Sequence, residues 1–429
     1  MEALALSKPI YAVYAALILL AFMQFVAVYY TVNNIVLAFC VLLCLGYSLV
    51  NPQTRIVNKA NFAPFMYLLF WLAYALLSYN WAIDQKSALE YALIIFINLA
   101  TFMVFSGLFR NKAMLRLSPW FFFIIFCLYL GIAVWEITSF QHLPVSRYFG
   151  EKTFVPTGPF TNENNLAAFF FIPLPFVLFI TRIHRSALLK LICGLLALGM
   201  FVVITIAGAR IAMLAAGLFL FISYFVLAAR STKLFGALIA ILLVFAAFQV
   251  AGPLMRLGYR MVKRELLSIS TEKESARMSS LRIREQLFAE TLDIAAGSWF
   301  MGVGGGNFET YMNSDRAHRT AGITNAHNYA LELLGNFGLL VPCAFAYLYF
   351  RWLFALYHRY RNGKGKQKSL YLMYLTSLIL FIPLSVLPSS IKWNHLLWVY
   401  FAAVNAMSNL DGEADPLYPA TPKYQEACA

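Results

Sequence analysis

Long runs of apolar residues alternate with short polar segments along most of this chain. A run of about 20 apolar residues crosses a bilayer as a helix, and none of these runs alternates apolar with polar positions as barrel strands do. The sequence therefore predicts an all-α, polytopic integral membrane protein with about twelve spans. They lie at residues 10–30, 34–50, 62–79, 87–109, 119–139, 164–181, 188–206, 211–229, 233–250, 328–350, 369–387 and 393–408.

These spans divide the chain into four parts. We expect spans 1–9 in residues 1–250, a long loop with amphipathic helices in 251–327, and spans 10–12 in 328–408. The tail at 409–429 is rich in acidic residues and proline, a composition that predicts disorder.

The overall composition is also that of a membrane protein. Hydrophobic residues make up 61% of the chain and charged residues 12%, whereas a soluble domain has about 25% charged residues. A soluble protein and a largely disordered chain are both excluded.

The distribution of Lys and Arg predicts the orientation. Of the 33 basic residues, 18 lie at the termini and in the loops after even-numbered spans, and five lie in the short loops on the other side. Because basic residues are retained on the cytoplasmic side, we expect both termini in the cytoplasm and the long loop outside.

The net charge of +14 mostly reflects this orientation, but the long loop holds ten basic residues of its own against eight acidic ones. At 254–265, Arg256, Arg260 and Arg264 share one helical face, which predicts an amphipathic helix at an anionic headgroup layer. Membrane lipids are therefore expected partners. Nucleic acid is a poor partner for a loop outside the membrane.

Arg210 is the only charged residue between Leu191 and Ala229. A 39-residue stretch makes two spans, so we expect a tight turn at 207–209 with Arg210 at the outer membrane edge. The side chain either anchors at headgroups or points into a substrate cavity.

Three further arginines precede or begin the predicted helix at 285–296. Arg277 and Arg284 are seven residues apart and share a helical face, whereas Arg282 and Arg284 are separated by about 200° around a helix. The segment is either part of a binding site or an ordinary solvated helix.

The end of the long loop contains a glycine-rich segment, Gly302–Asn307, and then His327 and Asn328. No Lys-Ser/Thr follows the glycines, so they indicate a tight backbone turn and not a phosphate loop. His327 is either a structural hydrogen-bonding residue or, with arginines from two outer loops nearby, a general base.

No cluster of His, Cys and carboxylate residues has the spacing of metal ligands, and we expect neither a metal nor another cofactor. The outer turn at 31–34 carries no carboxylate. The acidic residues Glu90, Glu136 and Glu332 are isolated in the sequence, which argues against an ion relay along the spans.

Several of these motifs resemble the O-antigen ligase and polymerase superfamily. Arg210-Ile-Ala-Met-Leu214 resembles the Arg-x-x-x-Leu motif of the WaaL-type O-antigen ligases. His327-Asn328 followed by Gly338 resembles their His-[Asn/Ser/Gln]-x9-Gly-x-x-Gly pattern, with Val341 in place of the last glycine. Residues 158–164 resemble an outer-loop signature, with Glu163 where proline is common, and Arg284 resembles the loop arginine, followed by Phe288 in the place of a tryptophan.

The resemblance implies transfer of O-antigen from undecaprenyl pyrophosphate to the lipid A–core oligosaccharide, at the periplasmic face of the bacterial inner membrane. Arg210 and Arg284 would bind the pyrophosphate without a metal, and His327 would be the base in an inverting displacement. Arg277, Arg282, Asn328 and Asn162 are further candidates for substrate contact.

Two other functions remain open. A polymerase of the same superfamily would use the same donor with a second lipid-linked glycan as acceptor. A flippase or transporter of lipid-linked oligosaccharides would form no bond, but the concentration of charge at the outer edge argues against it.

Overall fold

The computed structural model describes residues 59–110, 112–184, 186–227, 280–313, 317–320, 322–386 and 395–410. All regular structure in these ranges is helical, and no strand occurs in them. The all-α class predicted from the sequence is therefore confirmed for the part of the chain that the structure describes.

Seven helical segments are long and apolar enough to cross a membrane, as expected for a polytopic membrane protein. They are Phe62–Asn80, Gln85–Leu108, Met114–Ser139, Glu163–Ile183, Ala187–Ala207, Leu340–Asn362 and Gly365–Ser385. Two shorter apolar helices, α9 (Arg210–Leu227) and α17 (His395–Ser408), lie at the predicted eighth and twelfth spans. The expected spans at 10–30, 34–50 and 233–250 fall outside the described residues, and the count of twelve stays a prediction.

The predicted span at 328–350 is wrong. The structure places a short helix, α14 (Tyr329–Phe337), before a separate long helix, α15 (Leu340–Asn362). Gly338 breaks the chain between them with φ +63° and ψ −154°, which is a conformation open to glycine and strained for other residues. The membrane-spanning helix therefore begins 12 residues later than expected, at Leu340 instead of residue 328.

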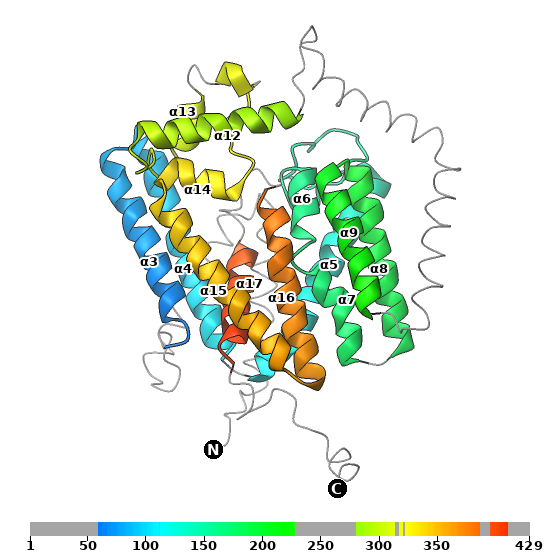
Figure 1. The fold of residues 1–429 in the computed structure, drawn as a ribbon. Helices are drawn as coiled ribbons and strands as arrows, with labels where there is room; N and C mark the ends of the chain where they lie inside the picture. The colour runs from blue at the N-terminus through cyan, green and yellow to red at the C-terminus, as the bar shows by residue number, and fades with distance from the viewer. Residues whose placement is uncertain are drawn as a thin grey trace.

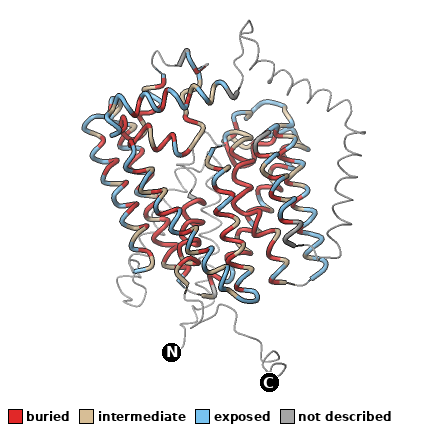
Figure 2. Tube along the Cα trace, viewed as in Figure 1, coloured by how far each residue is buried: buried red, intermediate tan, exposed pale blue. Residues whose placement is uncertain are grey.

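The long helices form a bundle whose inward faces are buried and whose outward faces are exposed (Figure 2). Helix α3 (Phe62–Leu77) packs on α4 (Gln85–Leu108), and α17 also packs on α4. Helix α16 (Gly365–Ser385) contacts both α15 and α7 (Leu174–Ile183), and thereby joins the two sides of the bundle. Large aromatic residues fill the interior, among them Trp71, Phe122, Tyr374 and Tyr400.

Four further helices lie on the same side of the bundle as α7. They are α5 (Lys112–Ser139), α6 (Glu163–Phe169), α8 (Ala187–Ala207) and α9. The predicted span at 164–181 consists of α6 and α7, which are separated by a turn at 170–173. Pro173 and Pro175 lie at this junction, where missing backbone N–H groups interrupt a helix.

A cap lies at one end of the bundle, over the side that holds α3, α4 and α15 (Figure 1). We define the cap as α12 (Ser280–Gly297), α13 (Phe308–Met312), the 3-10 helix η5 (Ala317–Thr320), α14 and their described connections up to Leu339. Helix α12 lies across α14 and also contacts η5. The cap has a small hydrophobic core of its own, made of Leu287, Ile294, Val303, Phe308, Met312, Ala326 and Leu331.

Candidate active site

Within the cap, the glycine-rich segment after α12 is joined to α14 through main-chain contacts. The N–H groups of Val303 and Gly304 donate to the carbonyl groups of Gly335 and Asn336, at 3.0 and 2.9 Å. At Gly302, which has φ +79°, an added Cβ would overlap the backbone of Asn336. The tight backbone turn expected from the glycines is confirmed, and its reason is the close approach of two main chains.

The same segment also binds the connection between α3 and α4. The side-chain amide of Asn307 accepts from the N–H of Asp84 at 2.7 Å and donates to the Asp84 carbonyl at 3.0 Å, as one peptide group pairs with another. The Asp84 carboxylate caps the N-terminus of α4, and hydrogen bonds from Ser87 hold its pKa below the usual range. The cap is thus fastened to the bundle by partly buried polar contacts.

His327 lies in the loop that enters α14, two residues before the helix begins. Its backbone has φ +46°, a left-handed conformation that is uncommon for residues other than glycine, although histidine adopts it more often than most. The preceding Ala326 is buried in the cap core, and the following Asn328 caps α14. His327 is therefore held in a strained conformation by ordered neighbours on both sides, a situation that is common at functional sites.

Two causes together lower the pKa of His327 from 6.5 to about 4: burial, which is the larger, and the positive charge of Arg284. A histidine with this pKa is neutral at pH 7, since its ordinary pKa is about 6.5. A neutral imidazole has a lone pair with which it can accept a proton.

Arg284 reaches this environment from the first turns of α12. Its side chain is partly buried, and burial lowers its pKa from the ordinary value. Arg282, two residues earlier on the same helix, is exposed. The two arginines therefore lie on different faces of α12, one exposed and one partly buried, as their separation of about 200° around the helix predicts. Arg277 lies outside the described residues.

The turn expected at 207–209 is present. Helix α8 ends at Ala207, Gly208 adopts a left-handed conformation with φ +70°, and α9 begins at Arg210. The turn lies at the same end of the bundle as the cap (Figure 1). The side chain of Arg210 is outside the part of the structure that is described, so its role in binding stays a prediction.

The two candidate asparagines are helix N-caps. The side-chain oxygen of Asn162 accepts from the N–H of Asn165 at 2.9 Å, and that of Asn328 accepts from the N–H groups of Ala330 and Leu331. Capping satisfies N–H groups that have no partner inside the helix. This structural role explains why asparagine stands at both positions, and their contact with substrate stays a prediction.

Glu136, which is isolated in the sequence, has several partners in the folded chain. Its buried carboxylate accepts from the N–H groups of Thr157 and Gly158 and from the Thr157 hydroxyl, and it contacts Nδ1 of His142 at 3.1 Å. These bonds fix the segment that leads to Asn162. Sequence reasoning missed the cluster because its members come from α5 and from a loop about 20 residues later.

Glu332 is also paired. The hydroxyl of Tyr91 on α4 donates to its carboxylate at 3.3 Å, and both side chains are buried. A pocket lies between α13 and α14 beside this residue, and its lining includes Asn325, Ala326 and Asn336. Among the described residues, no three His, Cys, Asp or Glu side chains gather closely enough to hold a metal ion.

The sequence is similar to proteins of bacterial polysaccharide synthesis. A sequence model of the family described as O-antigen ligase matches residues 195–346, a stretch that includes Arg210, Arg284 and His327. The teichuronic acid biosynthesis protein TuaE of Bacillus subtilis (strain 168) is 24% identical over 372 residues, which cover 82% of this chain and 74% of that protein.

Proposed function

Because the chain belongs to the O-antigen ligase/polymerase superfamily, we propose that it is an O-antigen ligase. It would transfer O-antigen polysaccharide from undecaprenyl pyrophosphate to the lipid A–core oligosaccharide. The site would face the periplasm at the inner membrane, with both chain termini in the cytoplasm. No metal ion or other cofactor takes part in this proposal.

The arginines would bind the donor. Pyrophosphate is a good leaving group, so the enzyme mainly has to position two lipid-linked substrates and stabilise the departing negative charge. A guanidinium group is always protonated and binds phosphate oxygens in pairs. Arg284 and Arg210 are assigned this role, and Arg277 and Arg282 are further candidates for contact with the glycan or its phosphates.

His327 would act as the general base. Its imidazole takes the proton of the acceptor hydroxyl while that oxygen attacks the anomeric carbon of the donor sugar. The bond from the anomeric carbon to the pyrophosphate breaks, and the bonding electrons leave with the pyrophosphate. A single displacement of this kind inverts the anomeric configuration.

The proximity of a neutral His327 to Arg284 carries this proposal. A base must be unprotonated before the reaction, and the low pKa of His327 meets that requirement at pH 7. When a pyrophosphate binds Arg284, its negative charge offsets the guanidinium charge, which raises the pKa of the imidazole toward the range that suits a base. Donor binding would thus prepare His327 for proton transfer.

A polymerase is the second candidate, since the family includes both activities and Val341 departs from the last glycine of the ligase pattern. The two functions differ in the acceptor. The test supplies purified protein with labelled undecaprenyl-pyrophosphate glycan, either alone or with rough lipopolysaccharide. With lipopolysaccharide present, a ligase transfers the labelled glycan to it. Without lipopolysaccharide, a ligase leaves the length of the donor glycan unchanged.

Longer lipid-linked glycan in the reaction without lipopolysaccharide would identify a polymerase instead. If neither product forms, while labelled donor crosses the membrane of proteoliposomes, the protein is a transporter of lipid-linked glycan. The His358→Ala variant is the matched control for this assay, because His358 lies on α15 far along the chain from the cap and is exposed.

A further inference from the structure

Helix α12 carries apolar side chains on its exposed side. Phe288 and Leu292 are four residues apart and share a helical face, with 51% and 42% of their surface exposed. Trp299 follows in the turn that ends the helix and is 88% exposed. The opposite side of α12 is buried against the cap core through Leu287 and Ile294. The exposed apolar side therefore has no partner among the described residues.

The turn after α12 is strained and firmly held. Trp299 and Phe300 have φ +54° and +57°, values that cost energy for residues with large side chains. The Phe300 carbonyl accepts from the N–H of Leu339, and the Met301 carbonyl accepts from the Tyr74 hydroxyl, at 3.0 and 2.9 Å. The fold thus fixes a turn that keeps Trp299 in the exposed position.

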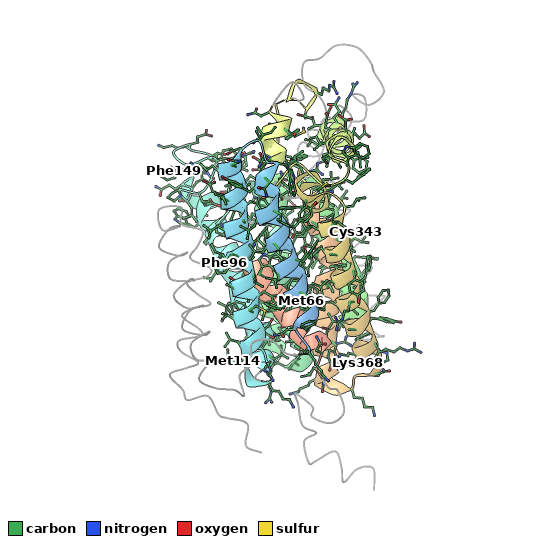
Figure 3. All side chains as sticks on the ribbon, turned by 90° about the vertical axis from the view of Figure 1, so that its left-hand side faces the viewer. Met66, Phe96, Met114, Phe149, Cys343 and Lys368 are labelled. Atoms are coloured by element: carbon green, nitrogen blue, oxygen red, sulfur yellow. The ribbon has the colours of Figure 1, made fainter. Side chains whose placement is uncertain are left out.

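This turn lies where two candidate membrane spans end. Tyr74 belongs to the span Phe62–Asn80, and Leu339 directly precedes the span Leu340–Asn362. Leu339 and Leu340 are themselves exposed. Figure 1 shows α12 lying across the end of the bundle, and Figure 3, turned by 90°, shows the cap above the ends of the long helices.

Charged residues occupy another part of the exposed surface of α12. Asp293 is exposed, and its side chain points about 100° around the helix from that of Leu292. The helix therefore has a side buried in the cap and an exposed side, on which the apolar Phe288 and Leu292 lie beside charged residues. Glu285, seven residues before Leu292, is exposed on the same face. A helix that lies in a membrane interface presents apolar side chains to lipid and carries its charged side chains toward water.

We propose that α12 is an interfacial helix and that Phe288, Leu292 and Trp299 insert into the lipid headgroup and upper acyl region next to α3 and α15. Tryptophan prefers this layer because its ring is apolar and its N–H is polar. Arg284 lies in the first turns of the same helix. The insertion fixes the height of Arg284 above the bilayer. This inference concerns lipid contact alone and holds whichever glycan the protein transfers.

Neighbouring cysteine variants test the inference. Leu292→Cys and Asp293→Cys are labelled with an environment-sensitive fluorophore in the full-length protein, which is placed in nanodiscs of phosphatidylethanolamine and phosphatidylglycerol. Cys343 is exposed and also reacts, so the signal of the labelled unmodified chain is subtracted. Both replaced side chains are exposed, so the substitutions leave the hydrophobic cores intact.

Lipids brominated on the acyl chains should quench the fluorescence of the label at Leu292→Cys about three times as strongly as that of the label at Asp293→Cys, or more. The reason is that only the label at position 292 reaches the acyl region. Aqueous iodide should show the reverse order. Equal quenching of both labels by iodide would overturn the proposal. A label at Leu292→Cys that neither lipid nor iodide quenches would also overturn it, and would indicate that a second copy of the chain covers this surface.

Discussion

Replacing Arg284 with glutamine removes a positive charge next to His327 while keeping a side chain of similar length. The pKa of His327 falls from 6.5 to about 4, and burial is the larger of the two causes, with Arg284 the second. If His327 is the base, activity requires its neutral form and is lost as the pH falls through its pKa. Without the charge of Arg284 the pKa of His327 should rise. The variant should therefore lose activity at a higher pH than the unmodified protein.

The size of the change follows from the order of the two causes. Arg284 accounts for less than half of the fall in the pKa of His327, so the Arg284→Gln variant should have a pKa between about 4 and 5 at His327. Loss of the guanidinium also weakens donor binding, which lowers kcat/KM at every pH. The informative quantity is therefore the midpoint of the acidic limb and not the height of the profile.

The assay is the pH dependence of kcat/KM for the lipid-linked donor, which reports the pKa of groups in the free enzyme. Arg282→Gln is the matched control, because Arg282 is exposed on the same helix, and its midpoint should equal that of the unmodified protein. An acidic midpoint near 6.5 in the unmodified protein would mean that burial does not lower the pKa of His327, and would contradict the prediction. An unchanged midpoint in Arg284→Gln would refute the part assigned to Arg284.

Three further substitutions test the cap. Gly338→Ala should reduce the yield of folded protein and lower its melting temperature, because the added Cβ overlaps a carbonyl group at φ +63°; Gly131→Ala, with open space around it, should be tolerated. Asn307→Ala should destabilise the cap by about 1–3 kcal/mol through the loss of three hydrogen bonds, two of them to Asp84, detected as faster hydrogen exchange in the α3–α4 connection. Arg284→Ala should weaken donor binding more than Arg282→Ala, and the reverse order would assign the site to the other face of α12.

Much of the fold was accessible from hydrophobicity alone. The expected span at 188–206 corresponds to α8 at Ala187–Ala207, and the turn at Gly208 lies where a lone arginine divides a 39-residue apolar stretch. The break at Gly338 was missed because the apolar pattern continues on both sides of it. A single glycine was the only local signal, and the contact that requires it comes from Phe300, 38 residues earlier in the chain.

The candidate site was predicted less completely. The N-capping roles of Asn162 and Asn328 follow from a rule that applies to sequence, since asparagine often directly precedes a helix. The pairing of Glu136 with His142 and of Glu332 with Tyr91 depends on tertiary contacts. The low pKa of His327 has the same origin, because burial and a charge from α12 are properties of the folded chain.

The most direct test of the central claim compares His327→Ala with the unmodified protein and with His358→Ala in one glycan-transfer reaction. Purified protein is mixed with undecaprenyl-pyrophosphate-linked glycan and rough lipopolysaccharide in excess EDTA, and the lipopolysaccharide is resolved on a gel. The unmodified protein and His358→Ala should produce a ladder of extended lipopolysaccharide, and His327→Ala should produce none while still binding donor. A full ladder from His327→Ala would contradict the assignment of His327 as the base.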